Sequence, residues 1–495
     1  MPKPNPASDL AVVGAGPAGL AAAVTAAGLG LRVTLLDAGE RPGGQYYRHP
    51  APELGAARPE ALHHGWSAFA EREAALRAHR AAGRITYLPS HHVWTVVADG
   101  ARGWTLYAVA GTGPDEEAAA VHARAVLLAT GSYERQLPFP GWTLPGVVGA
   151  GGAQAMLKSG LVLPGRRVVV AGSGPLLLAV AGSLAAAGAR VPAVVEAAAY
   201  TAYAGHVPAL LRNPGKLAEG ATYGSALLRR RIRLLTRHAV TEAHGADRVE
   251  AVTVTRLDRD WRPVPGTARR IPCDALAVGH GLVPQLELAT GLGCATRPAP
   301  DGTVALALDA EQRTSVPGIW SAGETGGIGG AQLALLEGEI AAHSVAAHSV
   351  AAHSPGGRSG VPSVPSVPSV PSVAAGPPSP AALTRRRARL RAFAAAMGAA
   401  HRPADGWTGW LREDTDVCRC EEVPAGRIRA AVSDLGARDA RTVKLLTRAG
   451  MGWCQGRMCG PAVAALAGDG PAPDRRPLSC PVPLGHLAEL PPADA

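Results

Sequence analysis

Four cysteines in the last fifth of the chain are spaced as metal ligands. They form a Cys-x-Cys pair and, 33 residues later, a Cys-x4-Cys pair, at Cys418, Cys420, Cys454 and Cys459. Four thiolates suit a [2Fe–2S] cluster, because soft sulfur ligands hold iron and their negative charge spreads over the cluster. Glycines surround the second pair, and such loops can turn backbone N–H groups toward sulfur and raise the reduction potential. We therefore expect an iron–sulfur site.

A structural zinc site is the alternative for these cysteines, because Zn²⁺ also takes four thiolates. Zinc ligand pairs more often have two to four intervening residues on both sides, so the Cys-x-Cys pair favours iron and sulfur. The other cysteines are expected to be core thiols at Cys273 and Cys294 and a free thiol at Cys480. An odd total of seven, four of them clustered, argues against a disulfide framework and indicates a reducing cytoplasm.

The sequence GAGPAG at 14–19 is a candidate phosphate-binding turn between a strand and a helix. Gly14 permits the tight turn, Gly16 lets the backbone approach a pyrophosphate, and Gly19 lets helix and strand pack closely. The start of the helix then offers free N–H groups and a positive dipole end to the phosphates. Asp37 ends the next strand, where a carboxylate can accept ribose hydroxyls, so a dinucleotide site is predicted here.

A second glycine motif, GSGPLL at 172–177, is imperfect. Gly172 and Gly174 stand in the first two glycine positions, but Leu177 replaces the third, where a branched side chain separates helix from strand or narrows the phosphate site. Glu196 ends the following strand, and an acid there favours NAD over NADP. The alternative is a nucleotide fold kept for its shape, with altered or lost binding.

Each motif lies in a strand–helix–strand unit, which is the frame a dinucleotide site needs. The first unit is expected at 9–13, 18–28 and 32–36, and the second at 167–171, 176–187 and 190–195. Apolar alternation predicts further strands at 93–97, 104–109, 121–129, 248–257, 275–278 and from 319, and a helix at 332–342. A repeat at an offset of about 155 residues indicates two nucleotide-type domains in tandem.

The composition changes at residues 343–380, which contain AAHSV-type and VPS repeats. Proline at every third position forces extended backbone, so this part is predicted to be a semi-rigid linker. His343, His348 and His353 recur every five residues, but no cysteine or acid accompanies them, which favours a linker over a metal site. A helical connector at 381–412, the cysteine module at 413–468 and an extended Pro-rich tail at 469–495 are expected to follow.

The formal net charge of +10 does not indicate a nucleic-acid partner, because no basic helix carries interleaved aromatic residues. One dense basic run, Arg385, Arg386, Arg387, Arg389 and Arg391, is expected to be a solvated helix face, with a docking surface for an acidic partner as the alternative. Apolar runs are cut by glycine within a few residues, so neither a signal peptide nor a transmembrane segment is expected. We expect a cytoplasmic protein.

Several motifs resemble the two-dinucleotide-domain flavoprotein reductases, which have a glutathione-reductase-like α/β fold. They are GAGPAG at 14–19, Gly43-Gly44-Gln45, Ala129-Thr130-Gly131 and Gly323-Glu324. The resemblance implies FAD along the first domain, with Gly44, Gln45, Thr130, Gly131, Gly323 and Glu324 among the residues that bind it. It also implies a split FAD domain at 8–160 and 271–342 around an inserted domain at 161–270 that normally takes NAD(P)H. The second domain has no Cys-x-x-Cys, so dithiol exchange is not expected.

The cysteine module resembles bacterioferritin-associated ferredoxin. Together with PGWTLPGV at 140–147 and CDALAVGHGLVPQLELA at 273–289, it is similar to large α-type subunits of the opine oxidase, hydrogen cyanide synthase and hydroxyproline dehydrogenase group. The resemblance implies a glycine-oxidase-like β-type flavoprotein partner and, in some complexes, a small ferredoxin-like subunit. The β-type subunit takes hydride from the carbon beside nitrogen, and the α-type subunit relays electrons onward.

Three functions follow as hypotheses. The leading one is an electron-transfer subunit of a multi-component amine or imino-acid dehydrogenase, with FAD or an interface flavin and the cluster. The second is a self-sufficient NAD(P)H-dependent reductase, and the third is a scaffold in which NAD or ATP has a structural role. His280 and Tyr133 are expected in strand or core positions, so no catalytic acid–base pair is predicted.

Overall fold

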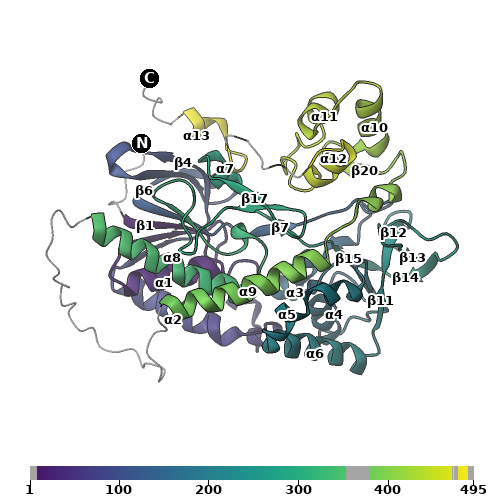
Figure 1. Cartoon of the computed structure of the whole chain (residues 1–495), viewed down its shortest axis with the longest axis horizontal. Helices are drawn as coiled ribbons and strands as arrows, with labels where there is room; N and C mark the ends of the chain where they lie inside the picture. Colours follow the sequence, from purple (N-terminus) through teal and green to yellow (C-terminus); the bar gives the residue numbers. More distant parts are fainter. Residues whose placement is uncertain (1–7, 353–379, 471, 473–475, 477, 489–495) are drawn as a thin grey trace.

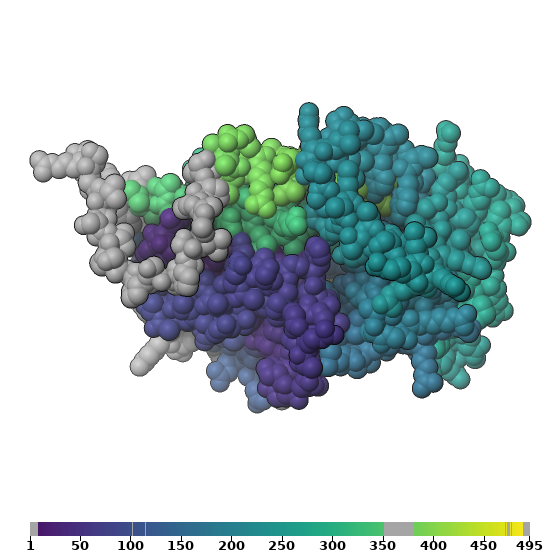
Figure 2. Space-filling view, turned by 90° about the horizontal axis from the view of Figure 1, so that it is seen from below, coloured from purple at the N-terminus to yellow at the C-terminus, as the bar shows by residue number. Residues whose placement is uncertain are grey.

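The computed structural model describes residues 8–352, 380–470, 472, 476 and 478–488. Figure 1 shows two α/β units side by side, with the C-terminal helices α10, α11 and α12 grouped apart from both sheets. Figure 2 shows the purple and blue first domain beside the teal second domain from another side. None of the helices in the described ranges combines the length and apolar character that crossing a membrane requires.

The first domain is built on a sheet in the order β3-β2-β1-β6-β5-β4, with β19 paired to β6. Its strands are β1 (Ser8–Val13), β2 (Val33–Leu36), β3 (Ile85–Leu88), β4 (His91–Ala98), β5 (Trp104–Ala110), β6 (Glu117–Leu128) and β19 (Ile319–Ser321). Its helices are α1 (Pro17–Gly28), α2 (Trp66–Ala81) and α8 (Ala331–Ala352). Strands β1, β2, β3, β6 and β19 pair in parallel, as a dinucleotide fold requires.

The second domain has a parallel sheet in the order β11-β10-β9-β15-β8. Its strands are β8 (Val147–Gly149), β9 (Val168–Gly172), β10 (Ala193–Glu196), β11 (Arg233–Thr236) and β15 (Ala275–Gly279), and its helices are α3 (Ala150–Gly160), α4 (Leu176–Ala186), α5 (Val207–Leu211) and α6 (Pro214–Arg229). Because β8 and β15 belong to this sheet, the domain extends beyond the predicted 161–270 at both ends. The predicted α/β class with two dinucleotide-type units is confirmed.

Smaller elements connect these sheets. They are β12 (His238–His244), β13 (Ala251–Arg256) and β14 (Arg269–Pro272) in one antiparallel sheet, the pairs β7 (Ser132–Glu134) with β16 (Leu282–Pro284) and β17 (Thr296–Pro298) with β18 (Val304–Leu306), and helix α7 (Glu287–Gly291). Short 3-10 turns are η1 (Pro52–Leu54), η2 (Pro59–Leu62), η3 (Gly100–Arg102), η4 (Gly113–Asp115), η5 (Tyr200–His206), η6 (Glu324–Gly326) and η7 (Asp405–Trp410).

The C-terminal part begins with a connecting helix and continues into the cysteine module. Its elements are α9 (Pro380–Ala400), β20 (Asp416–Cys418), β21 (Val423–Pro424), α10 (Ala425–Ser433), α11 (Ala440–Thr447), α12 (Gly460–Leu466) and α13 (Leu484–Ala488). The tail is therefore not extended throughout, since α13 is helical. The module's core is continuous with that of the second domain, because Leu257 and Trp261 pack in one cluster with Trp410 and Val417.

The predicted linker differs from the structure at its start. Helix α8 continues to Ala352, so His343 and His348 lie on a helix. Alanine is the best helix former, and the Ala-Ala pairs of the repeats allow the helix to continue to this point. His353 and the VPS repeats at 361–373 lie outside the described residues.

Helices α1 and α8 pack with almost no space between their backbones. A Cβ at Gly338 would lie 2.1 Å from the carbonyl oxygen of Ala18, which is backbone and cannot move aside. The Ala-rich sequence of α1 leaves it buried along most of its length, between the first sheet and α8. This close contact places the N-terminal part of α8 beside the first glycine loop.

A buried carboxylate on α8 holds helix α9 in place. The Glu337 side chain is fully buried and accepts hydrogen bonds from the guanidinium groups of Arg387 (2.8 Å) and Arg391 (2.7 Å). Glu337 also accepts from the N–H of Gly323, at 3.2 Å. The expectation that the arginine run is a solvated face is therefore wrong for Arg387 and Arg391, because a buried partner on another helix could not be identified from the run alone.

Replacing Arg391 with methionine should destabilise the protein, because it leaves a buried carboxylate with one guanidinium instead of two. We expect a loss of about 3 kcal/mol of unfolding free energy. Arg386→Met is the matched control, since Arg386 is exposed on the same helix, and it should change stability by less than about 0.5 kcal/mol. Denaturation in guanidinium chloride measures both, and equal losses for the two variants would contradict the assignment.

Candidate functional site

The first glycine loop is folded so tightly that only glycine fits. Gly14 has φ +105°, and a Cβ there would lie 2.3 Å from the carbonyl oxygen of Ala129. A Cβ at Gly19 would lie 1.7 Å from the carbonyl oxygen of Gly14, which explains the glycine at the third position. Gly16 faces more open space, where the nearest atom to a Cβ would be the Cα of Gly44 at 3.9 Å. The loop therefore leaves room beside Gly16, at the start of α1.

Asp37 lies at the end of β2, where the motif predicts it. One carboxylate oxygen accepts a hydrogen bond from the N–H of Ala15 and the other accepts from the N–H of Gly39. Burial raises the pKa of Asp37, while these N–H groups lower it. The carboxylate thus braces the glycine loop against the end of β2, at the place where a ribose would approach.

The motifs Ala129-Thr130-Gly131 and Gly323-Glu324 also lie at this edge of the first sheet. Strands β6 and β19 are hydrogen-bonded neighbours, so the residues that follow them, Thr130 and Gly323, lie at the same end of the sheet. A Cβ at Gly323, which has φ +86°, would lie 3.0 Å from the Cβ of Ala18 on α1. The structure therefore gathers the glycine loop, Gly44, the Thr130–Gly131 turn and Gly323 around the start of α1.

Glu324 differs from its neighbours in this group. Its carboxylate accepts hydrogen bonds from the N–H groups of Gly329 (2.6 Å) and Gly330 (3.0 Å), and burial raises its pKa. It therefore shapes the turn that leads into α8. The Arg391 guanidinium donates to the carbonyl oxygen of Gly323 at 3.2 Å, so helix α9 reaches this turn as well.

The second glycine loop is closed by the chain's own side chains. Glu196 is buried and accepts hydrogen bonds from the N–H of Gly174 (3.0 Å) and the N–H of Ala198 (2.9 Å). The ring Nδ1 of His401 lies 3.4 Å from Oε1, the oxygen that also accepts from Ala198. Asp37 at the first loop accepts the same two kinds of backbone hydrogen bond, so the feature that distinguishes the second loop is the His401 ring beside its carboxylate.

His401 follows helix α9 and is itself held in place. Its Nε2 lies 2.5 Å from the hydroxyl of Tyr203, and its carbonyl oxygen accepts a hydrogen bond from the Ser173 hydroxyl at 3.1 Å. Burial and Glu196 raise the pKa of Tyr203, so the phenol stays neutral and can donate. Ser173 belongs to the glycine loop, so His401 bridges the loop and its acidic residue.

The four candidate metal ligands come together in the C-terminal module as two pairs. Cys420 is in contact with Cys454, and Cys418 with Cys459. Cys418 and Cys459 are buried, each 1% exposed, whereas Cys420 is exposed. The N–H of Gly450 donates to the Cys418 sulfur at 3.4 Å. A Cβ at Gly452 would lie 2.2 Å from the Cβ of Cys420, so glycine is required beside the exposed pair.

This arrangement bears on the choice between iron–sulfur and zinc. All four thiols lie close enough together to interact. Two thiol pairs fit a cluster in which two irons share four cysteines. The remaining thiols match their predictions, since Cys273 and Cys294 are buried and Cys480 is unpaired.

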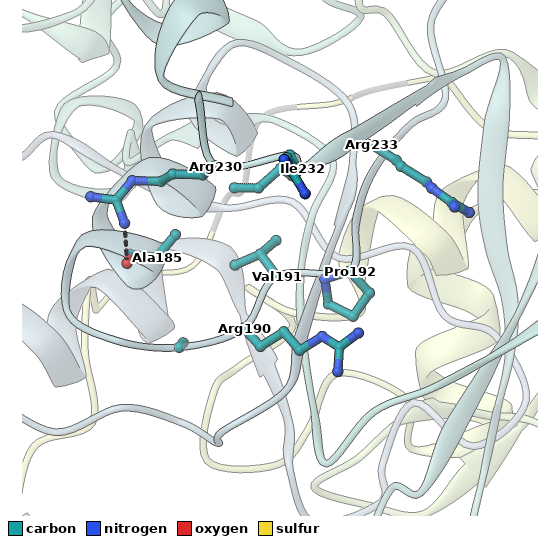
Figure 3. Close-up of a pocket in the computed structure, with 9 residues that line it drawn as sticks. Ala185, Arg190, Val191, Pro192, Arg230, Ile232 and Arg233 are labelled. Atoms are coloured by element: carbon teal, nitrogen blue, oxygen red, sulfur yellow. Dashed lines mark hydrogen bonds between the residues drawn. The ribbon is translucent and has the colours of Figure 1, made fainter. Parts of the chain in front are cut away.

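A pocket of about 600 Å³ lies elsewhere in the second domain, at the ends of α4 and α6. Four arginines contribute to its lining, Arg190, Arg230, Arg231 and Arg233. Figure 3 shows that the side chains of Arg190, Arg230 and Arg233 point in different directions, and the Arg230 guanidinium donates to the carbonyl oxygen of Ala185. The pocket opens where β10 and β11 begin, whereas ligands of such sheets bind at the carboxyl ends of the strands. It is therefore separate from the predicted dinucleotide site.

Sequence reasoning missed the residues that connect these sites. His401 and Tyr203 carry no motif, and Glu337 lies in an ordinary helical pattern. The arginine run was the available signal for the contact with Glu337. His280 is a core residue, as predicted: its ring lies beside the stacked rings of Trp261 and Trp410, and burial lowers its pKa to about 3.

Cys459→Ser should abolish assembly of the metal site, because it removes a buried thiolate from one of the two pairs. Purified protein should lose its iron and acid-labile sulfide, measured chemically, together with visible absorbance from the cluster. Cys294→Ser is the matched control, since Cys294 is also buried but lies far along the chain in the first domain's core. Zinc at one equivalent in place of iron in the unmodified protein would overturn the cluster assignment.

Two families match this chain. Residues 8–338 match the family Pyridine nucleotide-disulphide oxidoreductase, and residues 417–468 match the BFD-like [2Fe-2S] binding domain. The two matches coincide with the two α/β units and with the module that holds the paired cysteines. The predicted fold class is thereby confirmed, including its C-terminal [2Fe–2S] module.

Similar proteins extend over nearly the whole chain. The HcnB subunit of hydrogen cyanide synthase from Pseudomonas protegens is 35% identical over 460 residues, which cover 90% of this chain and 89% of that protein. An opine oxidase subunit of Agrobacterium tumefaciens is 32% identical over 497 residues, covering 98% of this chain and 92% of that protein. The alpha subunit of a sarcosine oxidase from Corynebacterium is 32% identical over 285 residues, covering 57% and 27%.

Among solved structures, L-proline dehydrogenase from P. horikoshii has the same fold, with a TM-score of 0.62 and 19% identity over 99% of this chain and 81% of that one. The predicted resemblance to the opine oxidase and hydrogen cyanide synthase group is confirmed. The chain belongs to the pyridine nucleotide-disulphide oxidoreductase family, within the group of oxidoreductase subunits that includes HcnB and its opine oxidase counterpart, with a BFD-like [2Fe–2S] binding domain at its C-terminal end.

Proposed function

We propose that this chain is the electron-transfer subunit of a heteromeric amine or imino-acid dehydrogenase. The observation that carries the proposal is the combination of a four-cysteine module with a second glycine loop whose acidic residue, Glu196, lies against the side chain of His401. A protein built to take electrons from NAD(P)H needs that loop free. A relay subunit does not, because its electrons come from another subunit.

The first domain would hold FAD. The room beside Gly16 and the N–H groups at the start of α1 suit a pyrophosphate. Asp37 and the Thr130–Gly131 turn would lie along the adenosine and flavin parts, with Gly44 and Gln45 on the opposite loop. FAD supplies the chemistry of taking up two electrons together and releasing them one at a time. The chain's own contribution is to bind it and to exclude water from the glycine loop.

The cysteine module would hold a [2Fe–2S] cluster on Cys418, Cys420, Cys454 and Cys459. The exposed position of Cys420 places one edge of the site near solvent, which suits exchange of electrons with a separate protein. The other two ligands, Cys418 and Cys459, are buried. Such a site accepts single electrons, which matches what a flavin can release.

Partners and substrate class follow from the relatives. Similar proteins are subunits of opine oxidase, sarcosine oxidase and hydrogen cyanide synthase, so partner subunits are expected here. We propose a glycine-oxidase-like flavoprotein that removes hydride from the carbon next to nitrogen, and a small ferredoxin-like protein is a further expected member. A reducing cytoplasm suits the unpaired thiols.

Mixing the purified protein with NADH or NADPH under anaerobic conditions tests the relay function against a self-sufficient reductase. The flavin absorbance should persist, because Glu196 and His401 occupy the second loop. Rapid bleaching by either nucleotide would defeat the relay proposal. Mass spectrometry of the nucleotides released on denaturation tests the scaffold alternative, since release of NAD or ATP without FAD would support that function instead.

Gly14→Ala should prevent FAD from binding, because the added Cβ would lie 2.3 Å from a backbone oxygen that borders the loop. We expect less than about a tenth of the normal FAD content, as a change of about 1.4 kcal/mol or more would produce. Gly30→Ala is the matched control, since Gly30 also has a positive φ of +92° but has nothing within 4 Å of a Cβ. Flavin fluorescence after denaturation measures the content, and full occupancy of Gly14→Ala would place the FAD elsewhere.

A further inference from the structure

An ion pair joins the loop between Cys454 and Cys459, here called the cluster loop, to helix α7. The Arg457 Nε lies 2.8 Å from the Oε1 of Glu287, with the side chains 18% and 4% exposed. Arg457 stands between two of the cysteines, Cys454 and Cys459, whereas Glu287 is the first residue of α7. The contact thus connects two parts of the chain that belong to different proposed cofactor sites.

Glu287 lies directly after a segment that is bonded to the flavin side of the first domain. The Thr130 hydroxyl donates to the carbonyl oxygen of Gln285 at 2.7 Å, and the N–H of Gln285 donates to the carbonyl oxygen of Gly131 at 3.0 Å. Glu287 is two positions after Gln285 along the chain, and Gln285 is bonded to the Thr130–Gly131 turn. The ion pair is therefore connected to that turn through a short stretch of backbone.

Arg457 is fixed by further contacts. Its guanidinium also donates to the carbonyl oxygen of Ser479 in the tail. Ser479 is in turn bonded to the first domain, through its N–H to the carbonyl oxygen of Trp94 (3.0 Å) and through its hydroxyl to that of Val93 (3.0 Å). Arg457 is therefore held by two segments: α7, through Glu287, and the tail at Ser479, which is bonded to β4 of the first domain.

The energetics indicate that the pair serves position rather than stability. The second oxygen of Glu287, Oε2, is buried and has no hydrogen-bond partner among the described residues. Burying a carboxylate with one oxygen unpartnered is costly, and an apolar pair of similar shape would stabilise the contact at least as well. The negative charge of Glu287 also acts on Tyr133, whose pKa is raised to about 12 by burial and by this charge.

We propose that Glu287 and Arg457 are positioning residues that set both the location and the reduction potential of the cluster relative to the flavin. This inference rests on the proposed function. The ion pair holds the Cys454–Cys459 loop against the segment that carries the Thr130–Gly131 turn, and so fixes the separation of the two sites. The positive charge of Arg457 favours the reduced cluster, which carries one more negative charge, and Glu287 opposes it.

Variants of the two residues should shift the potential in opposite directions. Arg457→Gln removes a positive charge and should lower the ratio of reduced to oxidised cluster about tenfold at a fixed potential, equal to about 59 mV for one electron. Glu287→Gln should raise this ratio, and Arg457→Lys should stay close to the unmodified protein because it keeps the charge. Spectroelectrochemical titration of the purified full chain measures each value.

Arg457→Gln and Glu287→Gln should also slow electron transfer from flavin to cluster at least tenfold, because each breaks the ion pair that joins the cluster loop to α7. Flash photoreduction of the flavin, followed by the loss of cluster absorbance, measures the rate. Glu421→Gln is the matched control: Glu421 pairs with Arg448 at 2.7 Å, beside Cys420, but within the module itself. It should raise the potential, as Glu287→Gln does, and leave the transfer rate within about twofold.

Two outcomes would overturn the inference. One is a Glu287→Gln protein that transfers electrons at the unmodified rate, and the other is a change of potential with the same sign in Glu287→Gln and Arg457→Gln. Failure of the proposed function is recognised separately, because unmodified protein would then lack FAD, iron or acid-labile sulfide. Circular dichroism in the visible range confirms that each variant carries an intact cluster before its potential and rate are compared.

Discussion

The fully buried carboxylate of Glu337 is the contact on which the arrangement of the whole chain depends. It joins α8, the turn at Gly323 and helix α9 at one point, since Arg387, Arg391 and the Gly323 N–H all converge on it. Removing a carboxylate from water costs free energy, which these three partners offset. These contacts therefore hold helix α9 in place, and its position determines where the residues that follow it lie.

Two consequences follow from the position of α9. Its end delivers His401 to the second glycine loop, where the ring meets Glu196 and Tyr203. The chain then passes through η7 into the cysteine module, whose core is shared with the second domain through Trp261 and Trp410. One helix thus brings His401 to the second glycine loop and also places the cysteine module.

The features that could be predicted from sequence are those that depend on local backbone needs. Glycine at 14 and 19 is required by contacts within a few ångströms of the loop, and paired cysteines carry their own spacing. No motif in the sequence assigns β8 and β15 to the second sheet. Strand β8 has only three residues, and β15 joins strands that all precede it in the sequence. Contacts such as Glu287 with Arg457 join residues 170 positions apart and leave no periodic trace in either segment.

The anchoring of Ser479 has a consequence for the order of assembly during synthesis. This residue bonds to the backbone of β4, 386 positions earlier, and to the arginine inside the cysteine loop. Domains generally fold from the N-terminus as the chain emerges from the ribosome, so both α/β units can form while the tail is still being made. The last clamp on the cysteine loop closes only when residue 479 has emerged. Until then the loop between Cys454 and Cys459 lacks this contact with the tail.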